Sequence, residues 1–201
     1  MNYLAHIVLS GANRDIQIGN FIGDAVKGRA YLHYPLAIQQ GILLHRQIDA
    51  FSDTHPLVKE AVHLTKEVGG RYAAVVTDIF FDHFLAVDFR LYATCSLGSF
   101  AWRFYMALLL RYRYLPPRMQ GFLWHFVMTN RLGCYASVKG IQRSLEIMVT
   151  YRNLGIQPEE TIDFLMQHYE ELQTLFQAFF PALQAMCQAE VVRTTTTMLN
   201  S

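Results

Sequence analysis

The sequence contains little charge and no excess of either sign. Only 16% of its 201 residues are charged and 52% are apolar, a composition typical of a compact protein with a core rather than of a disordered chain. Lys and Arg together number 17, against 16 Asp and Glu. Nucleic-acid binding usually requires a basic excess, so we expect no nucleic-acid partner.

Cysteine pairs, a signal peptide and membrane-spanning runs are also missing. Cys95, Cys134 and Cys187 form no CxxC pair, so neither a disulfide framework nor a thiolate zinc site is indicated. The first residues, Met-Asn-Tyr-Leu-Ala-His, lack the basic region and apolar core of a signal peptide. No segment reaches the roughly 18–20 unbroken apolar residues of a membrane span. We therefore expect a cytoplasmic protein with no membrane association.

Helical spacing of apolar residues dominates the chain. Leu36, Leu43, Leu44, Ile48 and Phe51 recur at intervals of three, four and seven, which predicts a helix over 35–53. Similar patterns predict helices near 71–92, 98–114, 117–131, 138–151 and 158–189. Prolines at 116–117 and the Gln-Pro-Glu-Glu sequence at 157–160 are typical of helix boundaries. With no repeat or linker, the sequence predicts a single all-α domain over 1–201, a helical bundle.

Asp and His residues are concentrated in the first ninety positions, which hold seven of the eight Asp and six of the eight His. Asp is a poor helix former, so its presence inside apolar helices calls for a reason. Short carboxylates and imidazoles are the ligands that divalent metals use.

The first candidate cluster is His45, Asp49 and Asp53. Residues four apart lie on one helical face, so His45 and Asp49 would project together. Asp53 could follow one turn later, or could instead cap the next helix.

The second cluster is Asp78, Asp82 and His83, on a segment that is apolar on nearly every side. Such a helix is expected to be buried, and buried carboxylates must be paired, protonated or bound to metal. Too few Lys or Arg lie nearby to neutralise both acids. We expect a metal or catalytic role for this cluster.

A third segment, Gly19 to Gly28, contains Asp24 and Lys27 between glycines that permit close backbone approach. Lys27 could meet a phosphate, although the segment is not a Walker sequence. His6 lies four residues after Asn2; on its own, a histidine of this kind is more often a core residue than a ligand.

Four ordered motifs together resemble the acyl carrier protein phosphodiesterases. They are Met1-Asn2-x-Leu4-Ala5-His6, Gly19-Asn20-x-x-x-Asp24-x-x-x-Gly28, Gly41-Ile42-x-x-His45-Arg46-x-Ile48-Asp49-x-x-x-Asp53 and Asp78-x-x-x-Asp82-His83-Phe84-Leu85. The family is distantly similar to the HD-type metal phosphohydrolases, which are all-α, although the tandem pair here is Asp82-His83 and not His-Asp. The resemblance implies hydrolysis of the phosphodiester that joins 4′-phosphopantetheine to holo acyl carrier protein, with Mn²⁺ or Mg²⁺ as cofactor.

The resemblance and the clusters together give a candidate set. We expect metal ligands among five residues, His45, Asp49, Asp78, Asp82 and His83. Asp24 and His6 would be the catalytic or neighbouring groups, and Lys27, Arg46 and Arg152 would bind the phosphate. Since the carrier is acidic, Arg111, Arg113 and Arg118 are candidates for docking it or are ordinary surface charges. Two alternatives stay open: a metal phosphohydrolase acting on a nucleotide or small phosphodiester, and a non-catalytic helical binding module.

Overall fold

The protein folds almost entirely into helices. The structure, a computed structural model, describes residues 1–152 and 155–199, with side chains for 1–150 and 155–190. The helices in chain order are α1 (Tyr3–Leu9), α2 (Arg14–Ile22), η1 (Gly23–Ala25), η2 (Ala30–His33), α3 (Leu36–Thr54), α4 (Pro56–Gly69), η3 (Gly70–Tyr72), α5 (Ala73–Val87), α6 (Phe89–Tyr92), α7 (Leu97–Leu110), η4 (Tyr112–Tyr114), α8 (Pro117–Met128), α9 (Arg131–Cys134), α10 (Val138–Arg152), α11 (Pro158–Gln167) and α12 (Tyr169–Leu199).

The predicted all-α class is confirmed, since the described residues contain no strand. α3 covers the helix expected over 35–53. α8 and α11 begin with Pro117 and Pro158 at the first helical position, where the missing proline N–H would have had no partner. None of the helices in the described part of the chain is long and apolar enough to span a membrane.

Two predicted long helices are each interrupted. The helix expected over 71–92 ends at Val87, because Asp88 leaves helical geometry and its carboxylate accepts hydrogen bonds from Gln173 and Gln177 of α12. The helix expected over 158–189 is two helices, α11 and α12, that meet at His168. Neither break coincides with a Pro or Gly, so the sequence pattern gave no sign of it.

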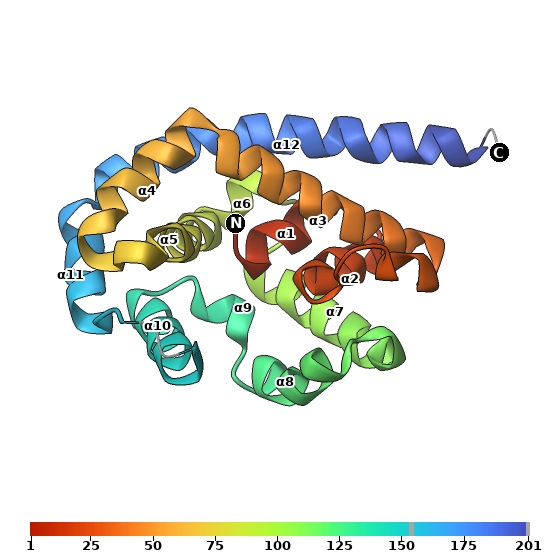
Figure 1. Ribbon diagram of the computed structural model, residues 1–201, viewed down its shortest axis with the longest axis horizontal. Coiled ribbons are helices and arrows are strands. Elements are labelled where there is room, and N and C mark those ends of the chain that lie inside the picture. The colour runs from red at the N-terminus through yellow and green to blue at the C-terminus, as the bar shows by residue number, and fades with distance from the viewer. Residues whose placement is uncertain (153–154, 200–201) are drawn as a thin grey trace.

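The core combines aliphatic side chains with many aromatic ones, and the fully buried aromatic rings come largely from α5, α7, α8 and α12. Eight of its fully buried residues are phenylalanines, at positions 80, 81, 84, 104, 126, 176, 179 and 180. α5 is buried on nearly all sides, as its apolar composition predicts. In Figure 1, α12 runs along one edge of the molecule beside α4 and α3, and the short α1 lies near the centre.

Two glycines bring α2 and α3 into direct backbone contact. A Cβ on Gly19 would overlap the Ile38 carbonyl oxygen, and one on Gly41 would overlap the Ile16 carbonyl oxygen. The helices can therefore cross this closely only because both positions lack a side chain. The crossing fixes α3, which carries His45 and Asp49, against α2, which carries Asn20.

Candidate metal centre

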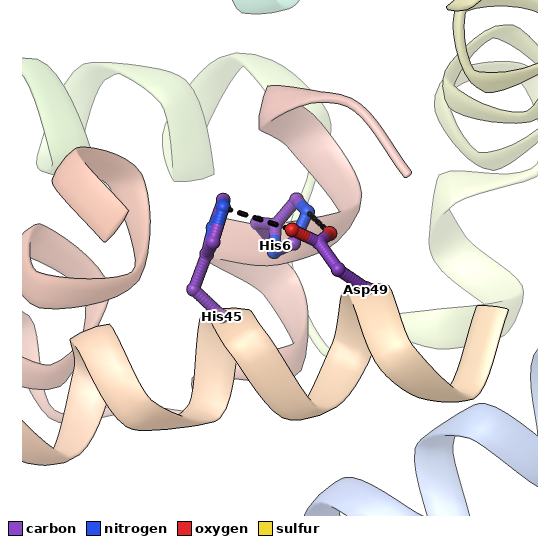
Figure 2. Close-up of side chains that lie close together, drawn as sticks. All are labelled: His6, His45 and Asp49. Atoms are coloured by element: carbon purple, nitrogen blue, oxygen red, sulfur yellow. Dashed lines mark ion pairs between the residues drawn. The ribbon is translucent and has the colours of Figure 1, made fainter. Parts of the chain in front are cut away.

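α1 and α3 bring together two histidines and one carboxylate. Nε2 of His6 lies 3.2 Å from Oδ1 of Asp49, and Nε2 of His45 lies 3.2 Å from Oδ2 of the same carboxylate. One ligand atom of each residue lies within 4.8 Å of the others. Figure 2 shows the two imidazoles side by side, with the Asp49 carboxylate reaching both. The arrangement is that of a possible metal-binding triad.

The positions of the three side chains follow from helix geometry and one tertiary contact. His45 and Asp49 are four residues apart on α3, so they project from one face, as the sequence predicts. His6 reaches them from α1, and its ring stacks on that of His45 with centroids 4.1 Å apart. Gly23 lies against His45 so closely that a Cβ there would overlap the ring. The His45 ring therefore has little room to move on that side.

Asn20 determines which nitrogen of His6 carries the proton. Its amide nitrogen donates to the His6 carbonyl oxygen and to the Ser10 hydroxyl, both at 2.8 Å. Its Oδ1, which can only accept, lies 2.8 Å from His6 Nδ1. His6 Nδ1 must therefore be the donor, which leaves an electron pair on Nε2 when the ring is neutral. Sequence reasoning missed this role, because nothing in the spacing of Asn20 and His6 indicates that their helices pack together.

The electron pair on His6 Nε2 faces other acceptors. The Met1 carbonyl oxygen lies 3.1 Å from it and the Asp49 carboxylate 3.2 Å. Burial lowers the pKa of His6 to about 4, although the hydrogen bond that the protonated ring would donate to Asp49 opposes that shift, so the ring is neutral near pH 7. Two electron-rich oxygen atoms thus face the electron pair of His6 Nε2. A cation there would turn their repulsion into coordination, so the donor set fits a divalent metal.

The charge on Asp49 is consistent with such a site. Burial alone would raise its pKa, but the hydrogen bond from His45, together with the one that a protonated His6 ring would donate, outweighs burial and holds the pKa well below its usual range. The carboxylate is ionised at every physiological pH. In addition, the buried Nδ1 of His45 has no hydrogen-bond partner among the described residues. The protein groups therefore do not satisfy the centre by themselves.

Asp78 lies beside the centre but outside the triad. Its Oδ1 pairs with the α-amino group of Met1 at 3.0 Å, and the Met1 carbonyl oxygen faces His6. The α-amino group is buried; burial lowers its pKa, but the attraction of Asp78, Asp49 and Asp82 outweighs that effect and raises the pKa overall. Negative charge therefore surrounds Met1 on the side of the triad.

Asp82 binds backbone groups of α1. Oδ2 accepts from the Leu4 N–H at 2.8 Å and Oδ1 from the Ala5 N–H at 3.1 Å, so both carboxylate oxygens cap the first turn of α1. Burial raises the pKa of this fully buried acid to about 7, and the two backbone hydrogen bonds limit the rise. Asp82 thus holds the helix that carries His6, and it does not contact the triad ligands.

His83 also has protein partners on both ring nitrogens. Nδ1 lies 2.7 Å from the Tyr135 carbonyl oxygen and Nε2 lies 3.0 Å from the Tyr169 hydroxyl. Burial lowers its pKa, which the bond to Tyr135 opposes. The ring joins α5 to α12 and is not part of the triad.

Two of the predicted catalytic and phosphate-binding residues, Asp24 and Lys27, lie in and just after η1, beside His45. Asp24 and Lys27 are exposed and pair with each other at 3.0 Å. Arg46 donates to the carbonyl oxygens of Val26 and Gly28, so it supports this loop. Arg152 lies outside the residues whose side chains the structure describes. Asp53 is exposed at the end of α3, and the next helix is capped by His55 and not by Asp53.

Fold and site together define an all-α protein with a two-histidine, one-carboxylate centre. The family model described as acyl carrier protein phosphodiesterase matches residues 1–183. The chain belongs to this family.

Curated relatives agree with the family match over nearly the whole chain. An acyl carrier protein phosphodiesterase from Yersinia enterocolitica is 32% identical over 189 residues, covering 94% of this chain and 98% of the relative. The one from Photorhabdus laumondii is 32% identical over 185 residues, covering 90% and 92%. The one from Serratia proteamaculans is 30% identical over 194 residues, covering 94% and 98%. No solved structure matches the chain, so its expected likeness to HD-type hydrolases stays a prediction.

Proposed function

We propose that the protein is a metal-dependent phosphodiesterase that releases 4′-phosphopantetheine from holo acyl carrier protein and so regenerates the apo carrier. The family and the names of its relatives support the reaction and the substrate. The observation that supports a metal is the proximity of His6, His45 and Asp49, whose ligand atoms lie within 4.8 Å of one another.

In this proposal His6 Nε2, His45 Nε2 and the Asp49 carboxylate bind the ion. Three protein ligands leave coordination positions open for water and a phosphate oxygen. Two imidazole nitrogens favour Mn²⁺ over Mg²⁺, since Mg²⁺ prefers oxygen ligands. When bound, such an ion neutralises phosphate charge and lowers the pKa of water.

The other side chains prepare this centre. Asn20 keeps the proton of His6 on Nδ1, so that Nε2 is free to coordinate. Asp82 fixes the start of α1 and with it the position of His6. The exposed Asp24–Lys27 pair follows Gly23, which contacts His45, so we assign Lys27 to a phosphate oxygen of the substrate and Asp24 to the attacking water. The proposed ligands leave out three of the five expected from sequence, because Asp78, Asp82 and His83 have other partners within the protein.

The test is the intact mass of holo carrier after incubation with the protein and Mn²⁺. Loss of the mass of phosphopantetheine is the expected result. The Asp49→Asn variant should lose at least about a hundredfold in rate, since even outer partners of metal ligands matter by 10–100-fold. Asp53→Asn, a change of the same kind one turn further along α3 at an exposed position, is the matched control and should retain activity.

Two results would contradict the proposal. If the wild type cleaves a small phosphodiester but leaves the holo carrier unchanged, the substrate assignment is wrong. If Asp49→Asn cleaves the carrier as fast as Asp53→Asn, the triad is not the metal centre.

A further inference from the structure

The charges of this nearly neutral chain are strongly segregated. Residues 89–145 contain seven arginines and one lysine, and all 16 acidic residues lie outside this segment. The segment spans α6 to α9 and most of α10. One part of the protein is therefore strongly basic although the net charge of the whole is only +1.

Most of these basic side chains reach solvent. Those at positions 90, 103, 113, 118, 139 and 143 are exposed, while Arg131 is buried. Arg111 is half-buried and forms an ion pair with Asp15 of α2 at 2.7 Å. Among the eight basic residues of this segment, Arg111 is the one that has a carboxylate partner within 4 Å in the described part of the chain. The exposed cations are thus available to an acidic surface from outside.

The outer face of α7 combines this charge with large apolar side chains. Trp102, Met106 and Leu110 are spaced by four and so lie along one face, with exposed fractions of 64%, 39% and 71%. Arg103 borders this stripe and shares a shallow open hollow with Trp102, Gly98 and Ser99. η4 follows directly and exposes Arg113. We refer to Trp102, Arg103, Met106, Leu110 and Arg113 as the α7 face.

This composition is typical of a protein-binding surface. Trp and Arg are the residue types most enriched among those that dominate binding energy. A large exposed apolar stripe is otherwise unfavourable for a protein in water. The absence of acidic residues from the whole segment means that an acidic partner would meet attraction and little repulsion.

We propose that the α7 face binds the carrier protein through an acidic surface that also exposes apolar side chains. This inference rests on the proposed function, because it names the surface that would receive the substrate of the metal centre. An acidic partner surface of this kind matches both features, since carboxylates would meet Arg103 and Arg113 while apolar side chains cover Trp102. A nucleic acid would use the cations but would leave the Met106 and Leu110 stripe uncovered.

The test is binding of fluorescently labelled apo carrier, which carries no scissile phosphodiester. Arg103→Glu/Arg113→Glu should raise Kd at least about tenfold, and Trp102→Ala by a similar factor, as for central interface residues. Lys59→Glu/Lys66→Glu reverses two exposed charges on α4, outside the basic segment, and is the matched control. Wild-type affinity should also fall as salt is raised. Far-UV circular dichroism and Mn²⁺ affinity report whether the variants are folded.

Hydrolysis separates failure of this surface from failure of the proposed function. On holo carrier, the α7-face variants should raise KM at least about tenfold with kcat nearly unchanged. If wild type cleaves the carrier and the variants bind and cleave it equally well, the α7 face is refuted while the proposed function stands. If wild type neither binds apo carrier nor cleaves holo carrier, both are wrong. If the face binds anionic vesicles in preference to the carrier, or a second copy of this chain, this inference is overturned.

Discussion

The role of Asn20 leads to the sharpest prediction. Asn20→Leu keeps the size of the side chain but removes three hydrogen bonds of 2.8 Å, to His6 Nδ1, the His6 carbonyl oxygen and the Ser10 hydroxyl. At about 1 kcal/mol each, their loss should lower the free energy of unfolding of the metal-free protein by about 3 kcal/mol. Separately, His6 would no longer be held in the Nδ1–H form.

The second effect should appear in metal affinity. Loss of an outer partner of a metal-binding histidine typically weakens binding 10–100-fold, or about 1.4–2.7 kcal/mol. We expect isothermal titration with Mn²⁺ to show a Kd increase in that range for Asn20→Leu. Asn20→Asp retains an acceptor for His6 Nδ1 and should bind Mn²⁺ far better than the Leu variant, even though it loses the two donated bonds.

A control separates stability from metal binding. Thr77 is fully buried, and its hydroxyl bonds to the Ala73 carbonyl oxygen and the Thr65 hydroxyl, away from the triad. Thr77→Val should destabilise the protein by about 1–2 kcal/mol while leaving Mn²⁺ affinity unchanged. An Asn20→Leu protein that is folded and binds Mn²⁺ within twofold of wild type would refute the tautomer argument.

Two further predictions concern neighbours of the triad. Gly23→Val should displace the His45 ring, because even a Cβ at this position overlaps it. Mn²⁺-dependent hydrolysis should then fall while the far-UV circular dichroism spectrum is retained. Unchanged hydrolysis would contradict the packing described for Gly23. Burial raises the pKa of Asp82 to about 7 from 3.8, so the native state binds this proton more tightly than the unfolded state does. Protonated Asp82 therefore stabilises the fold at low pH, and this stabilisation is lost as pH rises from about 4 to about 7. Asp82→Asn does not titrate at this position. Measured by urea titration, the difference in free energy of unfolding by which this variant falls below wild type should therefore shrink between pH 5 and pH 8. A difference that grows over this range would contradict the argument.

Residues near one another in sequence could be predicted together. The pairing of His45 with Asp49 follows from their spacing on one helix. Their meeting with His6 could not be derived in the same way, because it depends on the packing of α1 against elements 39 residues away in the chain. The family resemblance placed His6 near the site, but a histidine alone on a short apolar segment has no pattern that identifies its partner.

Asp82 is buried as its sequence context predicts, but its hydrogen-bond partners could not be identified from the sequence. A carboxylate on an apolar helix was expected to be paired, protonated or bound to metal, and it is indeed buried. Its partners are the backbone N–H groups of Leu4 and Ala5. Because every residue except proline has such a group, a sequence cannot indicate which helix terminus will reach a given acid. Counting nearby Lys and Arg therefore could not identify this partner.

The contact between α2 and α3 also restricts how this protein can be engineered. Replacing glycine by alanine inside a helix usually stabilises a protein by about 0.5–1 kcal/mol, and such changes are a common route to higher melting temperature. At Gly19 and Gly41 the added methyl group would meet backbone atoms of the opposite helix, which have no alternative rotamer. The two helices would have to separate, and Asn20 and His45 would separate with them. Gly19 and Gly41 should therefore be left out of any glycine-to-alanine stabilisation of this protein, since alanine there would disturb both the helix crossing and the proposed metal centre.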